Sequence, residues 1–106
     1  MSVKQDLGGR IRSLRRGRGR TQEQLAERVG LSVNYVSRIE RGLENPTLET
    51  LLGLAEALKV ELGDLFTFEQ QESDPKRLRQ FLAHLLDEAK GDQLSQAVKV
   101  LRALLR

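Results

Sequence analysis

The sequence predicts an all-α protein made of a five-helix domain, residues 1–68, and a C-terminal two-helix hairpin, residues 75–106. Three observations lead to this fold. Apolar residues recur at three- and four-residue spacing along most of the chain. Glycines and small polar residues separate these apolar stripes where helices are expected to end and begin. No segment shows the two-residue alternation of a strand, and the polar, aperiodic residues 69–74 are expected to form a linker.

The first two helices are predicted by one apolar stripe and one capping pattern. The first helix is expected to continue to about Arg16, and its stripe consists of Val3, Leu7, Ile11 and Leu14. Thr21 and Gln24 have the spacing of a capping box, in which each side chain bonds the backbone N–H of the other residue. They predict a second helix over residues 22–29 that buries Leu25, Ala26 and Val29.

The next three helices are marked by their caps and by short apolar runs. Ser32 is a favourable N-cap for a third helix, which is expected to end at Arg41 before Gly42. A fourth helix follows the loop at residues 45–47, and its stripe consists of Leu48, Leu51, Leu52, Ala55 and Leu58. Residues 61–66 predict a fifth helix of barely two turns, which contributes Leu62, Leu65 and Phe66 to the core.

The last two helices carry more apolar surface than they can bury against each other. Asp74 and Pro75 begin the first, which is expected to stop at Gly91, and its stripe consists of Leu78, Phe81, Leu82, Leu85, Leu86 and Ala89. The second carries Leu94, Ala97, Val98, Leu101 and Leu104. A hairpin of this size needs a further surface to cover both stripes. We favour the same region of a second copy, which makes residues 75–106 a dimerisation region. Docking onto residues 1–68 and binding of a different regulatory protein are the alternatives.

The charge is divided unevenly along the chain. The net charge is only +3, but residues 1–42 hold ten basic and four acidic side chains, which gives +6. Residues 43–66 hold one basic and five acidic side chains, which gives −4. A surface polarised in this way attracts a polyanion such as double-stranded DNA on one side only.

The residue types present exclude several function classes. Cysteine is absent and His84 is the single histidine, so the chain lacks the residues for a thiolate nucleophile or a typical metal centre. We find no nucleotide-binding loop and no acid–base pair, and therefore expect no cofactor and no enzyme activity. No apolar run approaches the roughly 20 residues of a membrane span. We expect a cytoplasmic protein without a membrane partner.

The third helix has two opposed faces. At about 100° per residue, Val36 and Ile39 project to one side. The opposite side carries Val33, Asn34, Ser37, Arg38 and Arg41. Arginine bonds guanine bidentately, asparagine bonds adenine, and valine contacts the thymine methyl group, while Arg41 is better placed for phosphate. Two short helices joined by a glycine-containing turn form the helix-turn-helix unit, whose second helix enters the major groove.

Several motif blocks occur here in order and with regular spacing: residues 21–26 (TQEQLA), 29–32 (VGLS), 35–42 (YVSRIERG) and 45–48 (NPTL). They resemble the Cro and phage-repressor type of helix-turn-helix domain, the XRE family, over about residues 5–66. The resemblance implies a lambda-repressor-like five-helix domain that binds double-stranded DNA. It also implies a prokaryotic or phage transcription regulator, commonly a homodimer on an inverted repeat.

Carried over by position, the resemblance implies that Gln22 binds phosphate and braces the recognition helix. It places at bases or nearby backbone the residues Ser32, Val33, Asn34, Ser37 and Arg38. An ion pair between Arg15 and Glu40 would tie the first helix to the third. Two positions depart from the family pattern: Arg20 stands where relatives usually keep an apolar residue, and Glu61 replaces a Ser-like cap of the fifth helix.

Together these observations predict a sequence-specific DNA-binding transcriptional regulator. We expect a repressor that binds an inverted-repeat operator as a homodimer through a recognition helix at residues 32–41. The alternative is a protein-interaction adaptor or antitoxin-like protein whose C-terminal helices bind a different partner. A stable self-dimer supports the first hypothesis, and a monomer with an exposed apolar hairpin supports the second.

Overall fold

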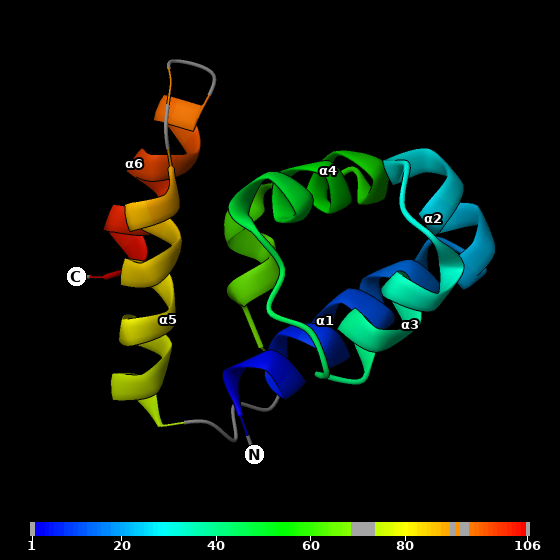
Figure 1. Cartoon of the computed structure of the whole chain (residues 1–106), viewed down its shortest axis with the longest axis horizontal. Coiled ribbons are helices and arrows are strands. Elements are labelled where there is room, and N and C mark those ends of the chain that lie inside the picture. The colour runs from blue at the N-terminus through cyan, green and yellow to red at the C-terminus, as the bar shows by residue number, and fades with distance from the viewer. Residues whose placement is uncertain (1, 69–73, 90, 92–93, 106) are drawn as a thin grey trace.

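The computed structural model describes residues 2–68, 74–89, 91 and 94–105, and every element in these ranges is a helix (Figure 1). The predicted linker lies outside the described residues except for Asp74. In chain order the elements are α1 (Val3–Gly17), α2 (Gln22–Val29), α3 (Val33–Glu40), α4 (Leu48–Leu58), η1 (Leu62–Phe66), α5 (Pro75–Glu88) and α6 (Ser95–Leu104). The all-α class is confirmed.

The predicted caps fix where the helices begin. Thr21 and Gln24 form the expected capping box: the Thr21 hydroxyl accepts from the Gln24 N–H at 3.1 Å, and the Gln24 side-chain oxygen accepts from the Thr21 N–H at 2.9 Å. The Ser32 hydroxyl accepts from the Tyr35 N–H at 3.1 Å and starts α3. A second capping box, at Ser2, starts α1 and was not predicted.

Three predicted boundaries need correction. The fifth helix is a 3₁₀ helix, which suits a run this short between two polar ends. It begins at Leu62 rather than at residue 61. Glu61 is its N-cap, and the Glu61 N–H donates to a carboxylate oxygen of Asp64 at 2.8 Å. Helix α3 ends one residue early, at Glu40, and α5 ends at Glu88, before Gly91.

One continuous hydrophobic core fills the interior of the molecule, with residues from Leu7 to Leu101. The stripe of α4 is corrected at one position: Leu54 is fully buried, whereas Leu52 is only partly buried. The backbones of α1 and α3 approach closely at Gly8, because a Cβ atom there would overlap the carbonyl oxygens of Ile39 and Glu40. This contact sets how far α3 can stand from α1.

The C-terminal helices pack against the first five elements. Four side chains of α5 and α6 belong to the same buried core cluster: Leu82, Leu85, Ala97 and Leu101. The Phe66 and Phe81 rings lie 6.3 Å apart between centroids and join η1 to α5. Docking within the chain, one of the three alternatives, therefore covers the deepest part of both stripes. Pairing with a second copy stays a prediction for the outer surface of α5 and α6.

Within the described residues, we find no helix with the length and apolar character needed to cross a membrane.

Candidate nucleic-acid interface

The two faces of α3 have the predicted orientation. Val36 and Ile39 are 1% and 2% exposed and anchor the helix in the core. On the other side Val33 is 44% exposed and Asn34 is exposed. Tyr35 is partly buried and packs against the core. Helix α3 is therefore seated by its apolar side and presents a mixed row of side chains to solvent.

A buried ion pair fixes α3 on α1. The Arg15 Nε–H donates to Glu40 Oε2 at 2.7 Å and the Arg15 Nη2 group donates to Glu40 Oε1 at 3.0 Å. This bidentate geometry confirms the ion pair that the resemblance implied. Burial raises the pKa of Glu40, but hydrogen bonds from Arg15 and Gln22 and the nearby charges of Arg15 and Arg12 outweigh it and hold that pKa below its ordinary value.

The same carboxylate also orients Gln22, the predicted phosphate ligand. The Gln22 side-chain amide donates to Glu40 Oε1 at 3.1 Å, and this amide carries a second N–H. Gln22 and Val33 both line a surface hollow of about 530 Å³ between α1, α2 and α3, together with Arg15, Arg16, Thr21 and Glu23. The structure thus brings Gln22 beside the exposed start of α3.

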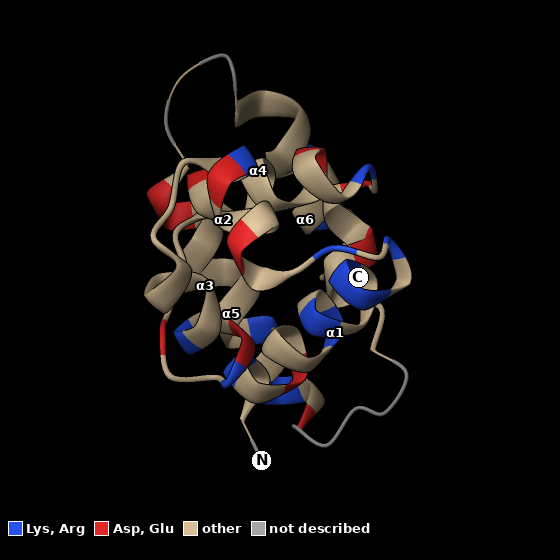
Figure 2. Cartoon of the chain, turned by 90° about the vertical axis from the view of Figure 1, so that its right-hand side faces the viewer, with Lys and Arg blue, Asp and Glu red and all other residues tan. Residues whose placement is uncertain are grey.

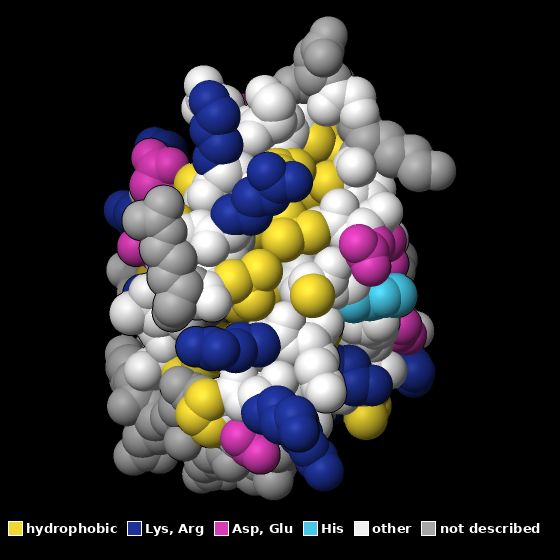
Figure 3. Space-filling view, turned by 90° about the vertical axis from the view of Figure 1, so that its left-hand side faces the viewer, with side chains coloured by type: hydrophobic (Ala, Val, Ile, Leu, Met, Phe, Trp, Pro, Cys, Tyr) yellow, Lys and Arg dark blue, Asp and Glu magenta, His cyan; other side chains and the backbone are white. Residues whose placement is uncertain are grey.

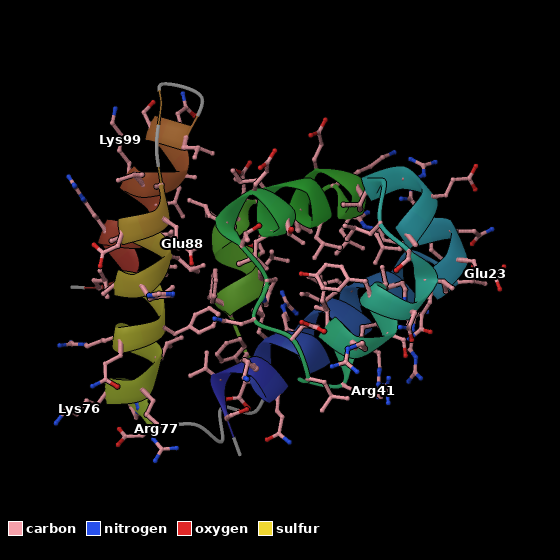
Figure 4. All side chains as sticks on the ribbon, viewed as in Figure 1. Glu23, Arg41, Lys76, Arg77, Glu88 and Lys99 are labelled. Carbon is pink, nitrogen blue, oxygen red and sulfur yellow. The ribbon has the colours of Figure 1, made fainter. Side chains whose placement is uncertain are left out.

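The remaining candidates lie along α3 and differ in their exposure and in their hydrogen-bond partners. Ser32 is exposed, and its hydroxyl caps the helix while keeping its own proton available. Ser37 is partly buried, and its carbonyl accepts from the Arg41 Nε–H at 3.3 Å. Arg41 lies just beyond the end of α3 and points outward (Figure 4). Arg38 is partly buried and its Nε–H donates to Glu44 Oε1 at 2.6 Å.

Several N-terminal arginines form hydrogen bonds within the fold and also contribute to the positive charge of the surface. Three of them donate to backbone carbonyl groups elsewhere in the chain: Arg10 to Asp64 at 2.8 Å, Arg18 to Lys59 at 3.2 Å and Arg20 to Ala57 at 2.6 Å. Two of these carbonyls lie at the C-terminal end of α4, which attracts cations. Arg20 therefore fits its unusual position by capping α4. In Figure 2, Lys and Arg residues (blue) gather along α1, while Asp and Glu residues (red) are more frequent around α4.

The single histidine, His84, lies on α5, outside this interface. Among the described residues, no group of three His, Asp or Glu side chains could hold a metal ion. His84 pairs with Glu88 on the same helix face at 3.1 Å, which is a surface contact. Helical periodicity does not predict the contact of Glu44 with Arg38 or the bonds of Arg18 and Arg20 to the end of α4, because these contacts join residues from separate elements.

Comparison with known proteins identifies the family. The helix-turn-helix family model matches residues 11–65, slightly more than half of the chain. The chain belongs to the XRE-type helix-turn-helix family. This is a family of DNA-binding transcription regulators and not of enzymes, and the all-α fold agrees with it.

Individual relatives cover mostly the first five elements. An uncharacterised HTH-type transcriptional regulator, y4dJ of Sinorhizobium fredii, is 43% identical over 67 residues, which are 63% of this chain and 87% of that protein. The immunity repressor protein of Bacillus phage phi105 is 44% identical over 57 residues, 54% of this chain and 40% of that protein. The crystal structure of the restriction-modification controller protein C.AhdI from Aeromonas hydrophila is 43% identical and covers 59% of this chain and 96% of its own, with a TM-score of 0.59.

This XRE-type protein is thus a transcriptional regulator.

Proposed function

We propose that this regulator is a repressor that binds an inverted-repeat operator as a homodimer. The observation that carries the proposal is the row of exposed side chains on α3, opposite the buried Val36 and Ile39. In a dimer, the two copies of α3 enter successive major grooves about 34 Å apart. The phage immunity repressor among the relatives supports the repressor role.

Each candidate side chain has a distinct expected role. Arg38 bonds guanine, Asn34 bonds adenine and Val33 contacts a thymine methyl group. Gln22 and Arg41 contact phosphate, since both lie at the ends of short helices beside the exposed row. Ser32 and Ser37 contact bases or the adjoining backbone through their hydroxyl groups.

The outer surface of α5 and α6 supports dimerisation through residues 75–106. Figure 3 shows a band of hydrophobic side chains across this face, with Lys and Arg side chains around and within it. Leu104 is 40% exposed, and Leu78, Leu86 and Leu105 are only partly buried although the core lies beneath them. A second copy covers such a band in a self-complementary way. A different regulatory protein at these helices is the competing occupant.

Sedimentation distinguishes these two occupants. The wild-type protein is expected to sediment as a dimer, and Leu104→Arg is expected to shift it toward monomer because it places a charge at an exposed apolar position of α6. Leu43→Arg is the matched control, because Leu43 is 50% exposed but lies on the loop after α3. A monomeric wild-type protein, or equal behaviour of both variants, contradicts dimerisation through this face.

Selection of bound sequences from a random DNA pool tests the whole proposal. An enriched inverted repeat is expected, and enrichment without symmetry contradicts the dimer. Arg38→Ala is expected to cost about 1–3 kcal/mol and to relax preference at one base pair of each half-site. Gln22→Ala is expected to weaken binding to all sequences similarly. With about 6 phosphates contacted per dimer, the logarithm of affinity falls with the logarithm of salt concentration at a slope of about −5.

A further inference from the structure

The loop after α3 folds back along the helix that precedes it. Gly42 has a φ of 74°, which L side chains rarely adopt. The Gly42 N–H donates to the Ile39 carbonyl at 3.0 Å, and the Leu43 N–H donates to the Arg38 carbonyl at 2.9 Å. These two bonds form a Schellman-type helix end. The reversal brings Glu44 beside the Arg38 side chain, six residues earlier in the chain.

The contact between Arg38 and Glu44 is short and accessible. The Arg38 Nε–H donates to Glu44 Oε1 at 2.6 Å, and the two side chains are 42% and 31% exposed. Within the described part of the chain, the structure gives no other hydrogen bond from the Arg38 guanidinium. The Nη1 and Nη2 groups therefore remain available, and they are the pair that bonds O6 and N7 of guanine.

We propose that Glu44 is a positioning residue for base recognition, holding the Arg38 guanidinium by Nε so that its two Nη groups face the major groove. This inference rests on the proposed function, in which Arg38 bonds guanine. A free arginine side chain samples many rotamers, and each rotamer that misses guanine lowers discrimination. Fixing one edge of the guanidinium leaves the other edge in the planar geometry that bidentate bonding requires.

The same carboxylate has an opposite effect on overall affinity. Glu44 places a negative charge on the loop that follows the recognition helix, where phosphates pass when α3 lies in the groove. Repulsion there weakens binding to every sequence, and salt screens it. Glu44 is therefore expected to lower affinity for random DNA while it raises discrimination at the base pair that Arg38 contacts. A residue with only a structural role would not change these two quantities in opposite directions.

The test compares Glu44→Gln with the wild-type protein on a selected operator, on operators substituted at each base pair, and on random DNA. Discrimination at the Arg38 base pair is expected to fall about threefold to tenfold, with the other base pairs unaffected. Affinity for random DNA is expected to rise about twofold to fivefold at low salt. Glu56→Gln makes the same charge change at an exposed position of α4 and is expected to alter neither quantity.

The double variant Glu44→Gln with Arg38→Ala isolates the coupling between the two residues. Discrimination at this base pair is expected to be the same in Arg38→Ala and in the double variant. The proposal is overturned if Glu44→Gln leaves discrimination at the Arg38 base pair unchanged or raises it. It is also overturned if Glu44→Gln lowers this discrimination further in the Arg38→Ala background. A loss of discrimination at all base pairs together with a loss of thermal stability overturns it as well. If Arg38→Ala itself weakens cognate and random DNA equally, the assigned role of Arg38 fails first and this inference fails with it.

Discussion

Replacement of Glu40 with glutamine tests whether one buried carboxylate holds the recognition helix in place. The Glu40 side chain is fully buried, its partner Arg15 is 9% exposed, and Arg12 lies 3.5 Å from the same carboxylate. Breaking a buried pair leaves an uncompensated buried charge, which costs about 3–5 kcal/mol. Glutamine keeps one acceptor oxygen for Arg15, so the expected loss for Glu40→Gln is at the lower end, about 3 kcal/mol. This is a large share of the ~5–15 kcal/mol that stabilises a typical domain.

The pH dependence separates this charge effect from a loss of packing. The pKa of Glu40 in the folded protein lies below its ordinary value of 4.5. The stabilisation from ionised Glu40 is therefore complete above the unfolded-state pKa and is lost as pH falls from there through the folded-state pKa. The free energy of unfolding should differ between wild type and Glu40→Gln by a constant amount above about pH 5.5, and the difference should narrow below about pH 4.5.

Urea denaturation followed by far-UV circular dichroism at pH 7, 5.5, 4 and 3 measures this difference. Glu27→Gln is the control, because Glu27 is an exposed residue of α2 and its loss should change the free energy of unfolding by less than about 0.5 kcal/mol. Two results would refute the assignment of this stabilisation to the Glu40 charge. One is a difference in free energy of unfolding as small as that of the control, and the other is a difference that stays constant down to pH 3.

Three further predictions concern packing and capping, each measured as a change in the free energy of unfolding in urea. Gly8→Ala should be strongly destabilising because the added Cβ atom would overlap the backbone at the end of α3. At Gly9→Ala the added Cβ atom has no neighbour within 4 Å, so this variant should stabilise α1 by about 0.5–1 kcal/mol. Equal effects of the two variants would contradict the close approach of α1 and α3. Leu101→Ala should cost about 2–5 kcal/mol in a single unfolding transition, and a separate transition for α5 and α6 would contradict their shared core. Arg20→Leu should cost about 1.5–3 kcal/mol by removing its bond to the end of α4, whereas exposed Arg16→Leu should be nearly neutral.

The sequence was sufficient for features that depend on neighbours within one or two helical turns. The capping box follows from the three-residue spacing of Thr21 and Gln24, which brings each side chain to the backbone N–H of the other residue. The two faces of α3 follow from the 3.6-residue period of a helix, which decides which side chains share a side. Boundaries were less certain where the end of a helix depends on packing. Helix α5, for example, stops at Glu88, three residues before Gly91, and Ala89 after it is extended.

Contacts between separate elements could not be predicted in the same way. The bond from Arg38 to Glu44 depends on the reversal at Gly42, and the bond from Arg20 to Ala57 depends on how α4 packs on α2. Periodicity places a side chain on a face but does not show which carbonyl or carboxylate lies opposite it. The ion pair between Arg15 and Glu40 was foreseen only because the family resemblance supplied that tertiary information.

The arginine bonds also change how the basic N-terminal charge should be understood. An arginine that donates to a backbone carbonyl keeps its full charge, so Arg10, Arg18 and Arg20 still contribute to the positive field although their side chains are held by the fold. The salt slope of binding counts the phosphates that are directly neutralised, whereas the association rate depends on the whole charge distribution. The charge of +6 on residues 1–42 therefore describes attraction of DNA at a distance better than it describes the number of phosphate contacts.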